Sequence, residues 1–258
     1  MTMGLTLYRV ALLVIYAGAV VVFVSLFFVT APYGRHARPG WGLTIPEKWG
    51  WGVMESPSVL IVALVFAVAL LRTGSVRPIA TLFFLLWEVH YVYRTFVFTS
   101  LMRQGSRRFP LLIAFFAILF NVLNAYVNGY YLFFLPSAYT VAWLIDPRFL
   151  VGLVIFAAGF VTHVGSDRVL RLLRNGGRQD YSIPYGGMFR FVSCPNYLGE
   201  LVEWAGWAVM TWSPAGLAFA VFTFANLFPR AISNHRWYLE TFGPEYPQDR
   251  KALIPFVL

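Results

Sequence analysis

Residues 8–31 read "YRVALLVIYAGAVVVFVSLFFVTA", an apolar run in which Arg9 is the only charged residue. A transmembrane helix needs about 20 predominantly apolar residues to cross the roughly 30 Å hydrocarbon core of a bilayer. The run is therefore long enough to span a membrane. It is also too long for the core of a cleaved signal peptide, so we expect it to be retained in the protein.

The same pattern recurs along the chain. Further apolar runs lie near residues 51–71, 78–101, 109–135 and 148–170, and 197–229 has room for two shorter spans broken at "WSPAG" (212–216). A composition of 59% hydrophobic and 12% charged residues lies outside the usual range of water-soluble domains. We therefore predict an all-α, polytopic membrane protein with about seven transmembrane helices, folded as a single membrane domain over residues 1–258.

Positive charge is distributed unevenly over the expected loops. If the N-terminus lies outside, 15 of the 20 Lys and Arg residues fall in the inner loops, the longest being 171–195, and in a basic tail formed by the last 29 residues. The positive-inside rule then predicts an outer N-terminus and a cytoplasmic C-terminus. The predicted location is the inner membrane in a bacterium or the endoplasmic reticulum membrane in a eukaryote. These loops account for the net charge of +9, so we expect no nucleic-acid partner.

Polar residues gather in the C-terminal third, on the predicted inner side. Asp167, Arg171 and Arg174 are four and three residues apart, so they share one face of a helix. A salt-bridged helix end and a binding site would both explain this group.

The segment "SCPNYLGELVEW" (193–204) places Glu200 and Glu203 close together in an otherwise apolar span. A carboxylate inside a membrane costs at least ~2.5 kcal/mol unless it is paired or faces a wet cavity, so a polar site is expected here. Cys194 is the only cysteine, which excludes an intrachain disulfide and a cysteine-based zinc cluster.

Two polar exceptions stand out in the N-terminal half. Glu55 lies near the start of the second apolar run, and "WEVHYVYRTF" (87–96) places His90, Tyr91 and Arg94 in the third. Taken alone, Glu55 fits the N-terminal end of a helix equally well. His90 fits a packed, hydrogen-bonded histidine. No second histidine lies at the spacing typical of metal ligands, so the sequence does not indicate a metal site.

Several motifs together resemble those of the steroid 5α-reductases. They are "HYVYRTFVF" (90–98), "GSDRVLRLLR" (165–174), "YSIPYGGMFRFVSCPNYLGELVEW" (181–204), "NHRWYLETF" (234–242) and "RKALIPFVL" (250–258). The resemblance begins at "APYGRHARP" (31–39) and so covers nearly the whole chain. Members of that family are seven-helix membrane enzymes that use NADPH to saturate the double bond of a 3-keto-4-ene steroid.

The resemblance implies roles for individual residues. Glu55 and Tyr91 would be the catalytic pair that holds the substrate ketone, with Trp51 as a wall of the steroid slot. Residues 1–135 would mainly form the substrate pocket, and residues 148–258 would mainly bind NADPH. The cofactor-binding residues would be Arg94, Arg103, Asp167, Arg171, Arg174, Tyr181, Asn196, Glu200, Arg230, Asn234 and Tyr238.

The chemistry of an enone agrees with this assignment. Hydride addition to the β carbon moves negative charge onto the carbonyl oxygen, and a hydrogen-bond donor aimed at that oxygen lowers the barrier. Tyr91 can donate, and Glu55 can orient it or donate directly. Asn196 and Glu200 would recognise the nicotinamide carboxamide, while Glu203 would brace a neighbour.

Three alternatives stay open at this point. The stretch "CPNYLGE" (194–200) is also similar to the "HPxYxG" pattern of membrane methyltransferases that use S-adenosylmethionine. An enoyl-CoA or polyprenol reductase would also act on a double bond. The third alternative is a transporter or a lipid-binding protein, which would not explain the polar residues that cluster on the inner side. The expected partners are a steroid-like enone and membrane lipid, with no obligate protein partner.

Overall fold

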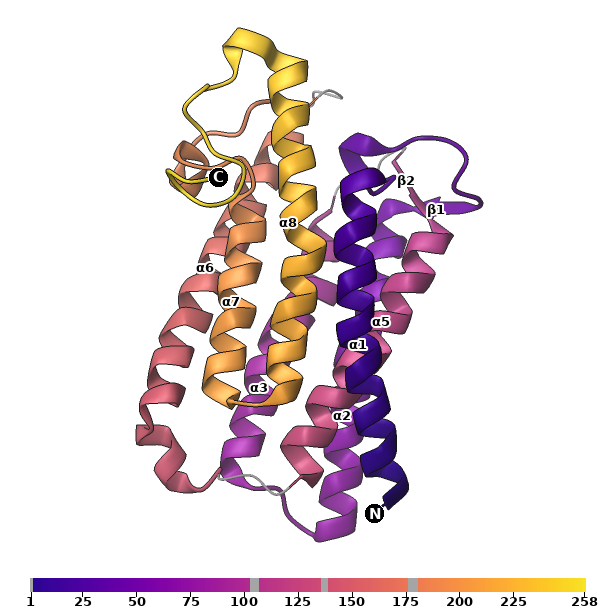
Figure 1. Ribbon diagram of the computed structural model, residues 1–258, viewed down its shortest axis with the longest axis vertical. Helices are drawn as coiled ribbons and strands as arrows, with labels where there is room; N and C mark the ends of the chain where they lie inside the picture. Colours follow the sequence, from indigo (N-terminus) through magenta and orange to yellow (C-terminus); the bar gives the residue numbers. More distant parts are fainter. Residues whose placement is uncertain (1, 103–106, 136–138, 176–180) are drawn as a thin grey trace.

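The computed structural model describes residues 2–102, 107–135, 139–175 and 181–258, which form long helices running along one axis of the molecule (Figure 1). The helices are α1 (Thr2–Phe28), α2 (Glu47–Thr73), α3 (Pro78–Val92), α4 (Phe98–Leu101), α5 (Leu111–Phe134), α6 (Pro147–Asn175), α7 (Pro195–Thr211) and α8 (Pro214–Phe242). The π-helical segment η2 (Tyr93–Val97) joins α3 to α4. The all-α prediction is confirmed.

Short elements connect the helices. They are the 3-10 turns η1 (Gly34–His36), η3 (Val141–Ile145), η4 (Gly187–Arg190) and η5 (Gly243–Glu245), and the antiparallel strands β1 (Thr44–Pro46) and β2 (Arg108–Pro110). Both strands lie at the end of the molecule that carries the C-terminus, and the N-terminus lies at the opposite end (Figure 1). The loops that the charge pattern assigns to one side of the membrane therefore gather at one end of the bundle.

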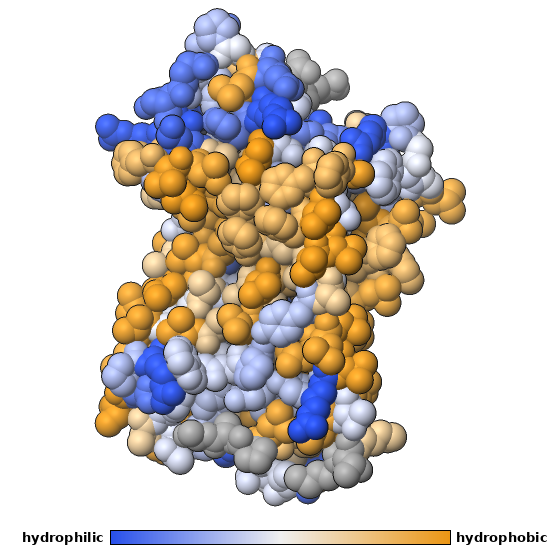
Figure 2. Space-filling view, viewed as in Figure 1, coloured by the Kyte–Doolittle hydropathy of each residue, from blue (hydrophilic) through white to orange (hydrophobic). Residues whose placement is uncertain are grey.

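Five helices in the described part of the chain are long and apolar enough to cross a membrane, namely α1, α2, α5, α6 and α8. Large apolar side chains on them face outward; Phe28 and Leu71 are 84% and 85% exposed. Figure 2 shows apolar residues over the middle of one face, below a polar cap. These features identify an integral membrane protein. The count of seven spans and the orientation of the termini stay predictions.

Helix ends follow local chemistry. Gly74 ends α2 in a left-handed conformation, with φ of 73°. The Ser213 hydroxyl accepts a hydrogen bond from the Gly216 backbone N–H, and Pro214 occupies the first turn of α8. The predicted break at 212–216 is therefore confirmed.

Two predicted boundaries were placed too early in the chain. Helix α8 continues through the first part of the expected tail to Phe242, and α6 continues through the start of the 171–195 connection to Asn175. Neither extension contains a glycine or a proline, and the glycines at 243 and 176 follow directly. Helices therefore persist beyond the apolar runs until a residue favours their end.

Helices α6 and α7 pack so closely that their backbones touch. A Cβ atom added to Gly159 would lie 2.2 Å from the backbone nitrogen of Glu203, and one added to Gly199 would lie 2.4 Å from that of His163. Gly152 and Gly206 meet the opposite backbone equally closely. Small residues permit such approaches between membrane helices, where packing rather than water exclusion drives association. This contact brings the polar ends of α6 and α7 together.

Replacing Gly159 or Gly199 with alanine should destabilise the protein. The added methyl group would meet backbone, which cannot rotate away, and overpacking typically costs about 1–3 kcal/mol or more. The melting temperature in detergent should fall for both variants. Gly165→Ala is the matched control, because Gly165 is also on α6 and a Cβ there has no atom within 4 Å. Equal melting temperatures for Gly159→Ala and Gly165→Ala would contradict the close packing.

Candidate functional site

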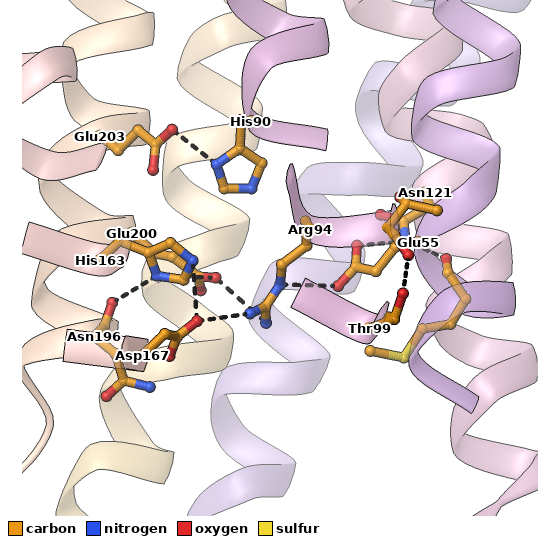
Figure 3. Close-up of polar contacts among 12 residues, drawn as sticks. Glu55, His90, Arg94, Thr99, Asn121, His163, Asp167, Asn196, Glu200 and Glu203 are labelled. Atoms are coloured by element: carbon orange, nitrogen blue, oxygen red, sulfur yellow. Dashed lines mark hydrogen bonds and ion pairs between the residues drawn. The ribbon is translucent and has the colours of Figure 1, made fainter. Parts of the chain in front are cut away.

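One arginine connects three helices inside the bundle. Arg94 lies in η2, where its Nε is 3.4 Å from Oε1 of Glu55 on α2. Its Nη1 is 3.4 Å from Oδ2 of Asp167 on α6, and its Nη2 is 3.4 Å from Oε1 of Glu200 on α7 (Figure 3). All four side chains are at most 13% exposed. Burial of these charges is tolerated because they pair with one another.

Arg94 and Thr95 lie within the π-helical turn η2. A π-bulge adds one residue to a helix and rotates the residues after it by about 100°. Such bulges occur often at functional sites.

His163 extends the cluster along α6. Its Nδ1 is 3.2 Å from the backbone oxygen of Asn196 and 3.6 Å from Oε1 of Glu200, and its Nε2 is 3.5 Å from Oδ2 of Asp167. The last two distances are longer than ordinary hydrogen bonds. The predicted residues Asp167, Asn196 and Glu200 therefore meet around one imidazole.

Tyr91 lies against a box of aromatic rings. It is 3% exposed, with its ring centroid 4.8 Å from that of Trp87 and 5.8 Å from that of Trp204. Tyr91 precedes Arg94 by three residues in the chain. Trp51 lies over the Arg94 guanidinium at 4.6 Å. Two of the three predicted substrate residues, Glu55 and Trp51, therefore contact Arg94.

A second cluster lies where η1 meets the end of α8. Arg35 donates to the Tyr238 hydroxyl at 3.2 Å, and its guanidinium also lies over the rings of Tyr181 and Trp237. His36 Nε2 is 3.0 Å from Oδ1 of Asn234. The predicted residues Tyr181, Asn234 and Tyr238 are therefore brought together by a loop from the N-terminal half.

This second cluster is cationic. Arg230 donates to the Tyr197 hydroxyl at 2.9 Å, and Arg107 lies over the Tyr181 ring at 4.7 Å. Burial lowers the pKa of His36. The hydrogen bond to Asn234 raises that pKa in part, and the positive charges of Arg35, Arg230 and Arg38 lower it further. Within the described residues, no carboxylate is paired with Arg35, Arg107 or Arg230.

Two polar atoms of this cluster are buried without a hydrogen-bond partner in the described part of the chain: Nη1 of Arg35 and the Tyr181 hydroxyl. Buried polar groups normally have partners, and guanidinium groups pair well with phosphate oxygens. The cluster therefore has the donor set and the aromatic surfaces that suit a phosphorylated ligand with ring systems.

For the other three predicted cofactor-binding residues, the structure describes no contact within either cluster. Arg103 lies outside the described residues, and the Arg174 side chain is not described, although its backbone belongs to α6. Arg171 lies on α6 one turn after Asp167, as their spacing predicts. A cavity of about 230 Å³ between α6 and η4 is lined by none of the predicted site residues.

Arg35, His36 and Arg107 were not among the site residues predicted from the sequence, and the partner of Glu203 was not identified there. That partner is His90, whose Nδ1 is 2.8 Å from Oε1 of Glu203. The interpretation of His90 as a packed, hydrogen-bonded histidine is confirmed. The one local signal for Arg35 was Gly34, which has a φ of 62° and precedes it in the turn.

Comparisons with known proteins agree on one group. The profile described as 3-oxo-5-alpha-steroid 4-dehydrogenase matches residues 107–258. The chain is 41% identical to a steroid 5-alpha-reductase of Arabidopsis thaliana, over 98% of this chain and 97% of that protein. It is 40% identical to the 3-oxo-5-alpha-steroid 4-dehydrogenase 1 of Homo sapiens, over 87% of this chain and 85% of that protein.

Replacing Arg94 with alanine should destabilise the protein strongly. It would leave Glu55, Asp167 and Glu200 without their shared cation, and removing one partner of a buried ion pair typically costs about 3–5 kcal/mol. The melting temperature in detergent measures this loss. Arg72→Ala is the control, because Arg72 is exposed at the far end of α2 and has no ion pair among the described residues. Similar melting temperatures for the two variants would show that Arg94 does not hold the cluster together.

Proposed function

Because the chain belongs to the 3-oxo-5-alpha-steroid 4-dehydrogenase family, we propose that it is an NADPH-dependent oxidoreductase that saturates the 4,5 double bond of 3-keto-4-ene steroids. The observation that carries the proposal is the position of Arg94. It joins Glu55, on the proposed substrate side, to Asp167 and Glu200, on the proposed cofactor side. The two halves of a reductase site would meet at this residue.

Tyr91 and Glu55 are proposed to bind the steroid ketone. As the β carbon is reduced, negative charge develops on the ketone oxygen, and the Tyr91 hydroxyl donates a hydrogen bond to it. Glu55 orients that hydroxyl or shares its proton. Arg94 fixes Glu55 by their ion pair, and the rings of Trp87 and Trp204 restrict Tyr91. The donor is thus held in place before the substrate binds, which avoids reorganisation during the reaction.

The cationic cluster is proposed to hold the cofactor phosphates. Arg35, Arg107 and Arg230 supply donors without carboxylate partners in the described part, and Tyr181 and Trp237 supply aromatic surfaces. Asn196 and Glu200 are proposed to bind the carboxamide of the nicotinamide. When bound, NADPH would supply the hydride that adds to the β carbon. The resulting enolate would take up a proton from water at the α carbon, which completes the saturation of the double bond.

A membrane location suits this substrate class. Steroids partition into lipid, and the apolar outer surfaces of the helices support a location of the enzyme in the same phase as its substrate. The relatives named above are reductases or dehydrogenases of steroids, so they give no support to the methyltransferase alternative. We propose the cytoplasmic side for the cationic cluster, in agreement with the positive-inside rule.

Tyr91→Phe and Glu55→Gln should each lower kcat strongly. Loss of one donor to a developing oxyanion typically costs about 10²–10³-fold. The assay is reduction of progesterone or testosterone by NADPH in detergent, with the 5α product followed by chromatography. The double variant should lose little more than either single variant, because groups that act as one unit are non-additive. Parent rates in both single variants would refute the ketone-binding pair.

NADPH should bind more tightly than NADH. The additional 2′-phosphate gives the unpaired arginines a further anion to bind. Quenching of tryptophan fluorescence in the purified protein would give both dissociation constants without any turnover. Identification of the nucleotide that copurifies, by mass spectrometry, would provide an independent check. Equal affinities would contradict the assignment of the cationic cluster to the phosphates.

A further inference from the structure

A second buried polar pair, separate from the Arg94 cluster, joins α3 to α7 (Figure 3). Glu203 on α7 is 0% exposed, and its Oε1 is 2.8 Å from Nδ1 of His90 on α3. Arg94 forms ion pairs with Glu55, Asp167 and Glu200, but none with Glu203 is present among the described residues. His90 is therefore the partner that compensates the burial of Glu203.

Burying Glu203 costs free energy that an apolar side chain would not cost. The second carboxyl oxygen of Glu203, Oε2, is buried and has no hydrogen-bond partner in the described structure. An apolar side chain of similar size would fill the space between α3 and α7 without the desolvation penalty of a charge. A role that needs the carboxylate itself accounts for its presence better than packing does.

His90 contacts the rings that hold the proposed ketone donor. Its ring centroid is 4.9 Å from that of Tyr91 and 4.6 Å from that of Trp204, with both ring pairs edge to face. His90 also stacks on His163, with ring centroids 5.7 Å apart. His90 therefore contacts both the aromatic rings around Tyr91 and the imidazole that meets Asp167 and Glu200.

Glu203 fixes the orientation of His90. The hydrogen bond of 2.8 Å joins Oε1 of Glu203 to Nδ1 of the imidazole. A partner at one ring nitrogen sets the orientation of an imidazole, as it does for histidines that bind metals. The contact thereby determines which edge of His90 faces the Tyr91 ring.

We propose that Glu203 and His90 are positioning residues for the enone reduction, acting through Tyr91. The inference rests on the proposed function. Glu203 holds His90 in one orientation, and His90 holds the Tyr91 ring at the angle from which its hydroxyl reaches the ketone. Neither residue contacts the steroid or the nucleotide in this scheme.

Glu203→Gln tests the proposal, because glutamine keeps the size of the side chain but replaces the carboxyl group that is hydrogen-bonded to His90. We expect kcat to fall about tenfold or more, as for other residues that orient a functional side chain. The steroid KM and the NADPH dissociation constant should stay near the parent values. His90→Gln should give the same split between kcat and KM, and it serves if Glu203→Gln does not fold. Parent kcat in the folded variant would overturn the proposal.

A double-mutant cycle separates positioning from a general structural effect. If Glu203 acts through Tyr91, then Glu203→Gln should cause little further loss in a Tyr91→Phe background. Losses that add fully would overturn the proposal. A fully active Tyr91→Phe would instead refute the ketone-binding pair, so the two failures are distinguishable. Glu88→Gln is the control, since Glu88 is also a carboxylate of α3 and is half-buried without a hydrogen-bond partner for Oε1 in the described part. It should react at the parent rate.

Discussion

The backbones of α6 and α7 meet without side chains between them, at Gly159 and Gly199. In a membrane this close contact gains dispersion energy, because packing rather than water exclusion drives the association of helices. It also leaves no freedom for either helix to slide. The polar ends of both helices are therefore fixed relative to each other, and His163 of α6 can lie between the backbone of Asn196 and the carboxylate of Glu200 on α7.

The interior charges illustrate how a bilayer protein can keep a polar site. Arg94 is shared among carboxylates from three helices, and Trp51 covers its guanidinium. Burying any one of these carboxylates alone inside the bundle would cost free energy. The ion pairs with the shared Arg94 cation offset that cost. The arrangement also means that no single helix contains the site. Its geometry depends on the packing of the whole bundle.

The sequence predicted the helical class and the break at 212–216, because both follow from local patterns of apolar residues, proline and glycine. The family resemblance also suggested Glu55, Asp167 and Glu200 as site residues, although no pattern indicated that Arg94 joins them. Contacts such as His90 with Glu203, 113 residues apart, have no local signature. Helix ends were misplaced where polar helix continues beyond the membrane-length run, since hydropathy measures lipid compatibility and not helix formation.

The hydrogen bond from Arg35 to Tyr238 joins residues that are 203 positions apart. During synthesis the N-terminal loop would emerge long before its partner on α8, and domains generally begin to fold from the end made first. The cationic cluster can therefore close only after nearly the whole chain has left the ribosome and α8 has been inserted. A chain that stops before α8 would carry Arg35 and His36 with no anchor, which gives cellular quality control a clear difference between unfinished and finished protein.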